Sequence, residues 1–163
     1  MTRLTTIELC SEELHFSIAH FTIFSATERE RLHGHNYCVH AFITLDVQAI
    51  GLSHDYAIYR QKLMVLCEQL DRYLLLPAEC PVMKITEDEI YYYAHFADDK
   101  MLFLKKDTKL MPLVNITLEE LSRWFVEQFV ADETFIARHH IQDIKIKVAN
   151  GPGQWASSDW SHC

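Results

Sequence analysis

Apolar and polar residues alternate in several stretches of the chain, a pattern that is typical of strands with one buried face. In the longest stretch, residues 34–48, apolar side chains recur at every second position from Tyr37 to Leu45. Further strands are predicted at 4–20, with room for a bulge, and at 141–148 and 154–160. Shorter strand-like pieces, separated by acidic turns, lie at 82–86, 90–93 and 101–104.

Two other stretches have the three- and four-residue spacing of amphipathic helices. The first covers 56–75, and Pro77 is expected to end it, because proline cannot continue a helix. The second begins at a T-x-x-E capping box, in which Glu120 follows Thr117 by three residues, and it continues to about residue 130. Residues 21–32 are expected to form a loop.

This order of elements predicts an α+β fold in which an antiparallel four-stranded sheet carries two helices on one face. The 163 residues suit a single domain, 1–163, with a small-strand insertion around 78–112. Such a sheet would leave its edge strands unpaired, so the chain needs some means of covering them.

The composition argues against several classes of protein. A net charge of −8 argues against a nucleic-acid-binding surface, which would need clustered lysine and arginine. No apolar run approaches the length of a membrane span, and the N-terminus lacks a signal-peptide pattern, so no membrane partner is expected. The five cysteines are odd in number and form no C-x-x-C pair, which indicates a reducing cytoplasm.

Three histidines form a candidate metal site. His33 and His35 flank Gly34 at the start of the longest predicted strand, where side chains two apart point to the same face. His20 ends an earlier strand-like run, and antiparallel pairing of the two strands would bring it beside them. Three histidines are a usual ligand set for a catalytic zinc, whose fourth position stays open for water or substrate. The alternative is surface or interface polarity, because an H-x-H pair alone is a weak motif.

The combination of motifs resembles one known family. F-S-I-A-H at 16–20, followed by H-G-H-N-Y at 33–37, is similar to the 6-pyruvoyl-tetrahydropterin synthase family, which includes the 6-carboxy-tetrahydropterin synthases. Weaker matches at 113–119 and 148–154 extend the resemblance over nearly the whole chain. It implies that His20, His33 and His35 hold a catalytic zinc and that the substrate is a pterin. It also implies a tunnelling-type fold, in which sheets join into a barrel as a trimer or dimer of trimers, with active sites between subunits.

The residue expected to act as catalytic base departs from the best-known members, which have a cysteine a few residues before H-G-H. Here no cysteine lies between Cys10 and Cys38, Arg29 occupies one likely position of the family's cysteine, and Glu30 stands in E-x-x-H-G-H spacing. A variant branch with glutamate there is thought to convert dihydroneopterin triphosphate into 6-hydroxymethyl-dihydropterin. Glu30 could serve as the base if burial or its neighbours raise its pKa. The alternative is a solvated residue of a charged run.

A second departure affects the expected proton relay. Many relatives have an aspartate followed by a histidine, whereas here Asp71 is followed by Arg72, which stays protonated and cannot shuttle protons. Asp71 could remain in a reduced relay, or the two residues could form a charge pair at a helix end. His54 is a possible but less favoured substitute.

A third departure concerns pterin recognition. The family anchors the pterin through a glutamate, which accepts two hydrogen bonds side by side, but this chain has Asn150, with one acceptor and one donor group. Glu119 and Thr117 match the family's T-x-E and could contribute to binding. Their plainer interpretation is a first-turn glutamate favoured by the helix dipole and an N-cap.

These observations favour a zinc-dependent lyase acting on the side chain of a dihydropterin, with Glu30 as base. Two alternatives remain open. One is a zinc-containing family member that has lost catalysis and binds a pterin or purine-like ligand. The other is an enzyme with a changed substrate, in which Asn150 contacts another heterocycle.

Overall fold

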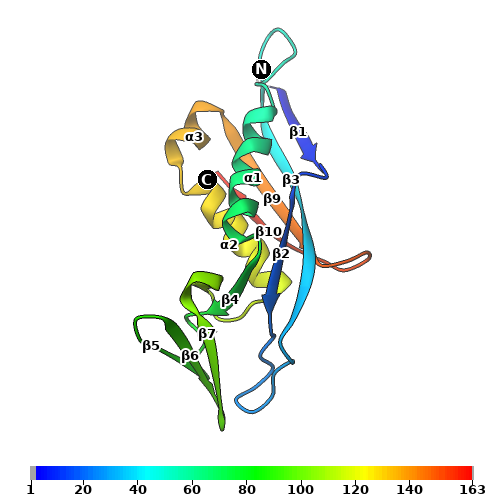
Figure 1. Ribbon diagram of the computed structural model, residues 1–163. Helices are drawn as coiled ribbons and strands as arrows, with labels where there is room; N and C mark the ends of the chain where they lie inside the picture. Colours follow the sequence, from blue (N-terminus) through cyan, green and yellow to red (C-terminus); the bar gives the residue numbers. More distant parts are fainter. Residues whose placement is uncertain (1–2, 163) are drawn as a thin grey trace.

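The chain folds around one large sheet, as seen in the computed structural model, which describes residues 3–162 (Figure 1). The sheet has seven strands in the order β10-β9-β3-β2-β4-β8, with β1 also paired to β3. The strands are β1 (Arg3–Leu9), β2 (His15–His20), β3 (His33–Val47), β4 (Tyr73–Pro77), β8 (Thr108–Met111), β9 (Ile141–Ala149) and β10 (Trp155–Ser161). The α+β class is confirmed, but the predicted strand count of four is too low.

The first predicted strand is divided in two. β1 pairs with residues 41–47 of β3 and β2 pairs with residues 33–38, both antiparallel and along the same edge of β3. Between them the chain turns at Ser11, whose carbonyl accepts from the amide of Leu14 at 3.0 Å. Two strands separated by a turn therefore replace the single, bulged strand that was expected over 4–20.

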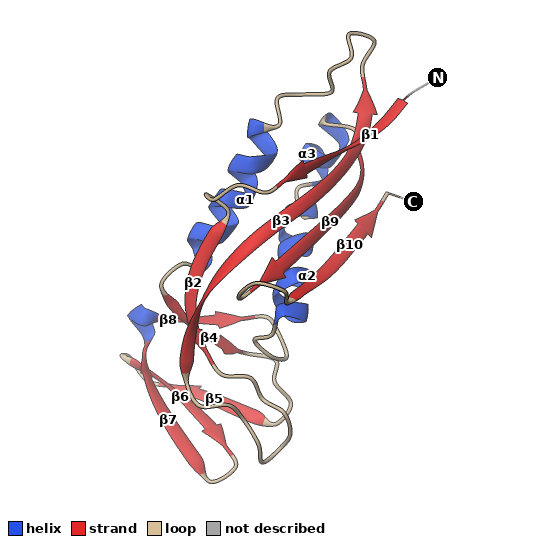
Figure 2. Cartoon of the chain, turned by 90° about the vertical axis from the view of Figure 1, so that its right-hand side faces the viewer, coloured by secondary structure: helices blue, strands red, loops and turns tan. Residues whose placement is uncertain are grey.

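The helices cover one face of the sheet (Figure 2). α1 spans Ala57–Leu70 and α2 spans Leu118–Val130, as predicted apart from the end of α1, and a short α3 (Glu133–Arg138) was not predicted. The expectation that the first helix reaches residue 75 and stops before Pro77 is wrong, because Tyr73–Pro77 is strand β4. The spacing of its apolar residues suits either a helix or a strand. Parallel pairing with β2 and β8 makes this segment a strand.

The main hydrophobic core lies between this sheet and the helices. Every second residue of β3 from Tyr37 to Leu45 is at most 2% exposed, which confirms the alternation read from the sequence. These side chains pack with apolar residues of both long helices, among them Leu63 and Phe125. None of the helices in the described part of the chain is long and apolar enough to cross a membrane.

A smaller sheet is built from the region of the predicted insertion. β5 (Met83–Glu87), β6 (Tyr91–Phe96) and β7 (Asp99–Leu104) pair antiparallel and form a three-stranded sheet of their own. It lies at the same end of the molecule as the loop that follows β2 (Figures 1 and 2). A second cluster of buried side chains, separate from the main core, joins this sheet to that loop. The expectation of a single domain over 1–163 stays a prediction.

Candidate metal centre

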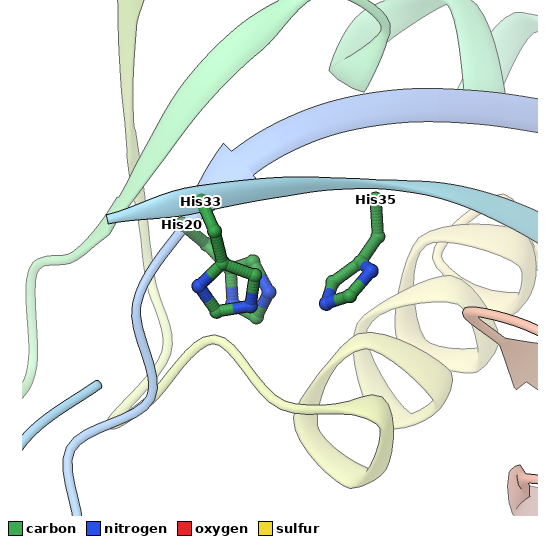
Figure 3. Close-up of side chains that lie close together, drawn as sticks. All are labelled: His20, His33 and His35. Carbon is green, nitrogen blue, oxygen red and sulfur yellow. The ribbon is translucent and has the colours of Figure 1, made fainter. Parts of the chain in front are cut away.

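The three histidines converge at the end where β2 leaves the large sheet. The expected antiparallel pairing is present: His20 of β2 lies directly opposite His33 of β3, and His35 follows two residues further along the same face. One ring nitrogen from each histidine can be chosen so that all three lie within 4.8 Å of one another. Figure 3 shows the three rings on the same side of the strands, above the segment that leads into α2.

Close strand packing explains the glycine between two of the histidines. Gly34 lies opposite Ala19 on β2, and a Cβ atom at Gly34 would come within 3.3 Å of the carbonyl oxygen of Ile18. That contact is tighter than ordinary van der Waals packing, so a larger residue would push the two strands apart. The histidines depend on this strand spacing because they come from both strands.

Backbone carbonyl groups orient two of the rings. Nδ1 of His20 lies 3.0 Å from the carbonyl oxygen of Ile116, and Nδ1 of His33 lies 2.7 Å from that of Arg31. A carbonyl oxygen only accepts, so each Nδ1 carries the proton and each Nε2 is the unprotonated nitrogen, which is the one able to bind a metal. Metal-binding histidines commonly have such a partner on their second nitrogen.

Burial favours the neutral, metal-binding form of His20. Its side chain is 4% exposed, and burial lowers the pKa of its imidazole, an effect reinforced by the two neighbouring histidines and only partly offset by the hydrogen bond to Ile116. His33 and His35 are only half-buried, so the site opens toward solvent on their side. Three imidazoles with one open side fit a divalent transition metal such as zinc.

Tyr37 also belongs to the site, although the sequence analysis gave it no role beyond its place in the predicted strand. Its hydroxyl lies 3.0 Å from Nε2 of His20 and donates to it, since that nitrogen is the unprotonated one, so a metal bound there would take the place of this hydrogen bond. Burial raises the pKa of Tyr37, so the hydroxyl stays protonated. Its position two residues after His35, on the same face, was the signal that could have found it.

Glu30 lies beside the histidines. Its Oε2 atom is 3.8 Å from Nε2 of His33 and accepts from the amide of Thr22 at 3.0 Å. Burial raises the pKa of its carboxyl, but the bonding to Thr22 and the proximity of His33 outweigh that effect, so the net shift is downward. The condition of a raised pKa is therefore not met. The carboxylate is ionised at neutral pH and can accept a proton.

Asp71 has its contacts away from the three histidines. Its Oδ1 atom accepts from the amide of Ser17 at 2.8 Å, and Oδ2 lies 3.3 Å from Nε of Arg72. Arg72 has a left-handed backbone with φ of 66°, its amide donates to the carbonyl of Ser17 at 2.7 Å, and its side chain is 89% exposed. Within one chain, the contacts of Asp71 are those of a helix end held against β2. Its role in a relay remains a prediction.

The three candidates for substrate binding are distributed around the same end of the sheet. Thr117 is the N-cap of α2 and accepts from the amide of Glu120 at 3.3 Å, and it directly follows Ile116, whose carbonyl oxygen orients His20. Glu119 is exposed in the first turn. Asn150 follows the end of β9, where Ala149 pairs with Cys38, so it lies next to Tyr37 along the strand pairing.

Asn115 is a structural residue that the motif contained without an assigned role. Its amide nitrogen donates to the carbonyl of Ile23 at 2.8 Å, and its Oδ1 accepts from the amides of Ile23 and Ile116 at 3.1 and 3.0 Å. It thus joins the loop after β2 to the segment before α2. The separation of 92 residues between Asn115 and Ile23 hides this link from local patterns.

Comparisons with known proteins point to one family. The profile of the family described as 6-pyruvoyl tetrahydropterin synthase matches residues 9–159. A protein of Methanocaldococcus jannaschii, provisionally named 6-carboxy-5,6,7,8-tetrahydropterin synthase, is 26% identical over 160 aligned residues covering 88% of each chain.

Solved structures are similar over almost the full length. The 6-pyruvoyl tetrahydropterin synthase of Plasmodium vivax superimposes with a TM-score of 0.92 at 26% identity, covering 98% of this chain and 99% of that one. The Plasmodium falciparum protein gives a TM-score of 0.91 at the same identity and coverage. Two further structures of the P. vivax protein are described as catalytic-residue mutants, in which alanine or cysteine replaces a glutamate.

Proposed function

The chain belongs to the 6-pyruvoyl tetrahydropterin synthase family, and from that premise we propose that it is a zinc-dependent lyase acting on the side chain of a dihydropterin of the dihydroneopterin triphosphate type. His20, His33 and His35 would hold the zinc. One observation carries the proposal: a carboxylate, Glu30, lies 3.8 Å from Nε2 of His33, at the open side of three converging imidazoles. When bound, zinc would polarise the side-chain oxygens of the substrate and stabilise negative charge on them.

The position of Glu30 favours cleavage of the side chain and the product 6-hydroxymethyl-dihydropterin. In a retro-aldol cleavage, the carboxylate takes the proton of the hydroxyl on the second side-chain carbon. The O–H electron pair forms a carbonyl as the bond between the first and second carbons breaks, and the released pair is held by the pterin until the first carbon is protonated. Support comes from the P. vivax relatives, in which a glutamate is described as the catalytic residue.

The other residues of the site would bind and orient the substrate. Glu119, Thr117 and Asn150 lie on elements that surround the histidines, and we propose that they contact the pterin ring. Asp71 would complete a reduced relay, in keeping with its place in the family motif. We further propose that the protein works in the cytoplasm as a homo-oligomer, trimer or dimer of trimers. The large sheet leaves β10 and β8 as edge strands within residues 3–162, which copies of the chain could cover.

Product analysis tests the proposed reaction. The zinc-loaded protein is incubated with dihydroneopterin triphosphate beside Glu30→Gln and, as a matched control, Glu28→Gln, because Glu28 is exposed on the same loop. We expect a 6-hydroxymethyl product that is lost in the first variant and retained in the second. A 6-pyruvoyl product would keep the enzyme but require another base, and the absence of any product would contradict the proposal.

Metal analysis tests the zinc site separately. We expect about one zinc per chain in the purified protein and its loss in His33→Ala. His162→Ala is the control, because His162 is exposed beside Trp160 and follows β10 at the end of the sheet away from the three histidines. Full retention of zinc in His33→Ala would exclude this site.

A second function is a zinc-containing protein that binds a pterin or purine-like ligand without turnover. The lowered pKa of Glu30 favours it, because a more acidic carboxyl is a weaker base, and so do the contacts of Asp71 with Ser17 and Arg72. Tight binding of a dihydropterin without any product would support this function. An enzyme with a changed substrate would show turnover of another heterocycle.

A further inference from the structure

The loop that carries Glu30 rests on the small three-stranded sheet. Phe21 and Ile23 of this loop are at most 8% exposed and belong to the second hydrophobic cluster. The other members come from β4 and from the chain between Cys80 and Phe96: Leu76, Cys80, Met83, Ala94 and Phe96. The loop is therefore packed against the insertion and not against the main core.

Arg29 makes the polar connection between the same two parts. Its Nη2 atom donates to Oδ2 of Asp99, at the start of β7, at 3.0 Å, and its Nη1 atom donates to the backbone carbonyl of Glu30 at 2.9 Å. The guanidinium carbon lies 5.2 Å from the centre of the Phe21 ring. One guanidinium thus contacts the small sheet, the loop core and the backbone of Glu30.

The side chain of Arg29 is well fixed for a residue near the surface. It is 20% exposed, and its Nε atom is buried without an acceptor among the described residues. Leaving this buried donor unpaired is unfavourable. The position of the guanidinium is therefore determined by the hydrogen bonds of its other two nitrogens, Nη1 to Glu30 and Nη2 to Asp99. The side chain of Asp99 is 62% exposed, and within residues 3–162 its carboxylate forms its ion pair with Arg29.

The backbone on the far side of Glu30 is also held. The amide of Glu30 donates to the carbonyl of Thr22 at 2.8 Å, while the Glu30 carboxylate accepts from the amide of Thr22. Glu30, Arg29 and Asp99 line one groove of about 760 Å³. The carboxylate beside His33 is therefore positioned from both ends of a short segment, by Thr22 on one side and by Arg29 on the other.

We propose that Asp99 is a positioning residue, which acts through Arg29 to hold Glu30 at the working distance from His33. The small sheet then supports the active site through Arg29, although none of its residues binds the metal or the substrate in this scheme. The inference rests on the proposed function for its effect on turnover. Its structural part, the order of the Glu30 loop, does not depend on the substrate.

We expect loss of the Arg29–Asp99 pair to lower turnover and to leave stability nearly unchanged. Exposed ion pairs contribute little to stability, so the melting temperature and zinc content should hardly change when the pair is removed. A displacement of a catalytic group by about 1 Å can reduce turnover by about 10²-fold. We expect Asp99→Asn to lower kcat about tenfold or more while KM stays within about twofold, because Glu30 would take part in the reaction and not in binding.

The experiment uses five variants of the full-length, zinc-loaded chain, including Asp99→Asn. Asp98→Asn is the matched control, because Asp98 is the neighbouring exposed acid in the same turn. Asp99→Glu keeps the carboxylate and should restore most of kcat. Arg29→Gln also removes the bond to the Glu30 carbonyl, so it should lower kcat at least as much as Asp99→Asn. The double variant should be no worse than Arg29→Gln alone, since Asp99 acts through Arg29. An unchanged kcat in Asp99→Asn, or a rise in KM alone, would overturn the inference.

Hydrogen exchange measured by mass spectrometry gives a readout that needs no activity. Residues 21–32 should exchange faster in Asp99→Asn than in Asp98→Asn, while the peptide covering β3 stays unchanged. Equal exchange in the two variants would overturn the inference whatever the enzyme does. Absence of turnover in the wild-type chain would instead count against the proposed function, so the two failures are distinguishable.

Discussion

Replacing Asn115 with alanine should weaken both the fold and the metal site, because one side chain joins two segments that meet at the histidines. The change removes three hydrogen bonds: the donation to the carbonyl of Ile23, and the acceptance from the amides of Ile23 and Ile116. Ile23 is 8% exposed and Ile116 is fully buried, so water cannot readily replace the lost partner.

The size of the effect follows from these bonds. A typical hydrogen bond contributes about 0.5–1.5 kcal/mol, and a buried donor left without a partner costs more, so we expect a loss of about 2–4 kcal/mol in the free energy of unfolding. In a domain of this size that corresponds to a fall in Tm of roughly 4–16 °C. Because the carbonyl of Ile116 orients His20, we also expect zinc affinity to fall by about 10–100-fold.

Urea unfolding and competition with a chromogenic zinc chelator measure the two effects. Asn115→Asp keeps the two acceptor bonds and loses the donor, so its loss of stability should be intermediate. The control is Asn36→Ala, because Asn36 is exposed and bonds only to the hydroxyl of Ser17 among the described contacts. We expect that control to stay within about 0.5 kcal/mol of the parent. A loss below about 1 kcal/mol in Asn115→Ala would refute the reasoning, since it would mean that the three hydrogen bonds of Asn115 add no net stability.

Three further predictions concern single side chains. Tyr37→Phe should raise zinc affinity while leaving the fold intact, because it removes the hydroxyl that competes with zinc for the lone pair on Nε2 of His20; equal chelator competition in both proteins would contradict this. Burial, and then the neighbouring His54, lower the pKa of His139, so the free energy of unfolding should fall as the pH drops below about 6.5, where the unfolded chain takes up the proton first. Urea titrations in His139→Gln should show a smaller fall, and an identical pH profile would exclude His139 as a source. Cys10 is the one exposed thiol among the four free cysteines described, so a maleimide should label it first; mass spectrometry showing a buried cysteine labelled earlier would disprove the accessibility argument.

The parts of the fold that follow from local periodicity could be predicted from the sequence. The alternation from Tyr37 to Leu45 predicted the central strand, and the capping box at Thr117 predicted the start of α2. The geometry of the histidine cluster needed only one further assumption, the antiparallel pairing of His20 with His33. Each of these depends on residues close in sequence or on a single pairing.

Features that depend on distant contacts could not be predicted. The apolar run at Tyr73–Pro77 suits a helix or a strand, and only pairing with β2 and β8 makes it β4. The pKa of Glu30 falls because of Thr22 and His33, whose positions depend on how the loop folds. The link between Arg29 and Asp99 crosses 70 residues, and no spacing rule would have joined them.

The chain passes from the main hydrophobic cluster to the small one between His20 and Phe21. The side chains just before this point, including Phe16 and Ile18, belong to the main core, and those just after it belong to the small one. The strands that carry the imidazoles are thus supported by the main cluster, and the loop that carries the Glu30 carboxylate by the small one. A substitution in the small cluster can therefore move the Glu30 loop while the strands that carry the three histidines keep their packing.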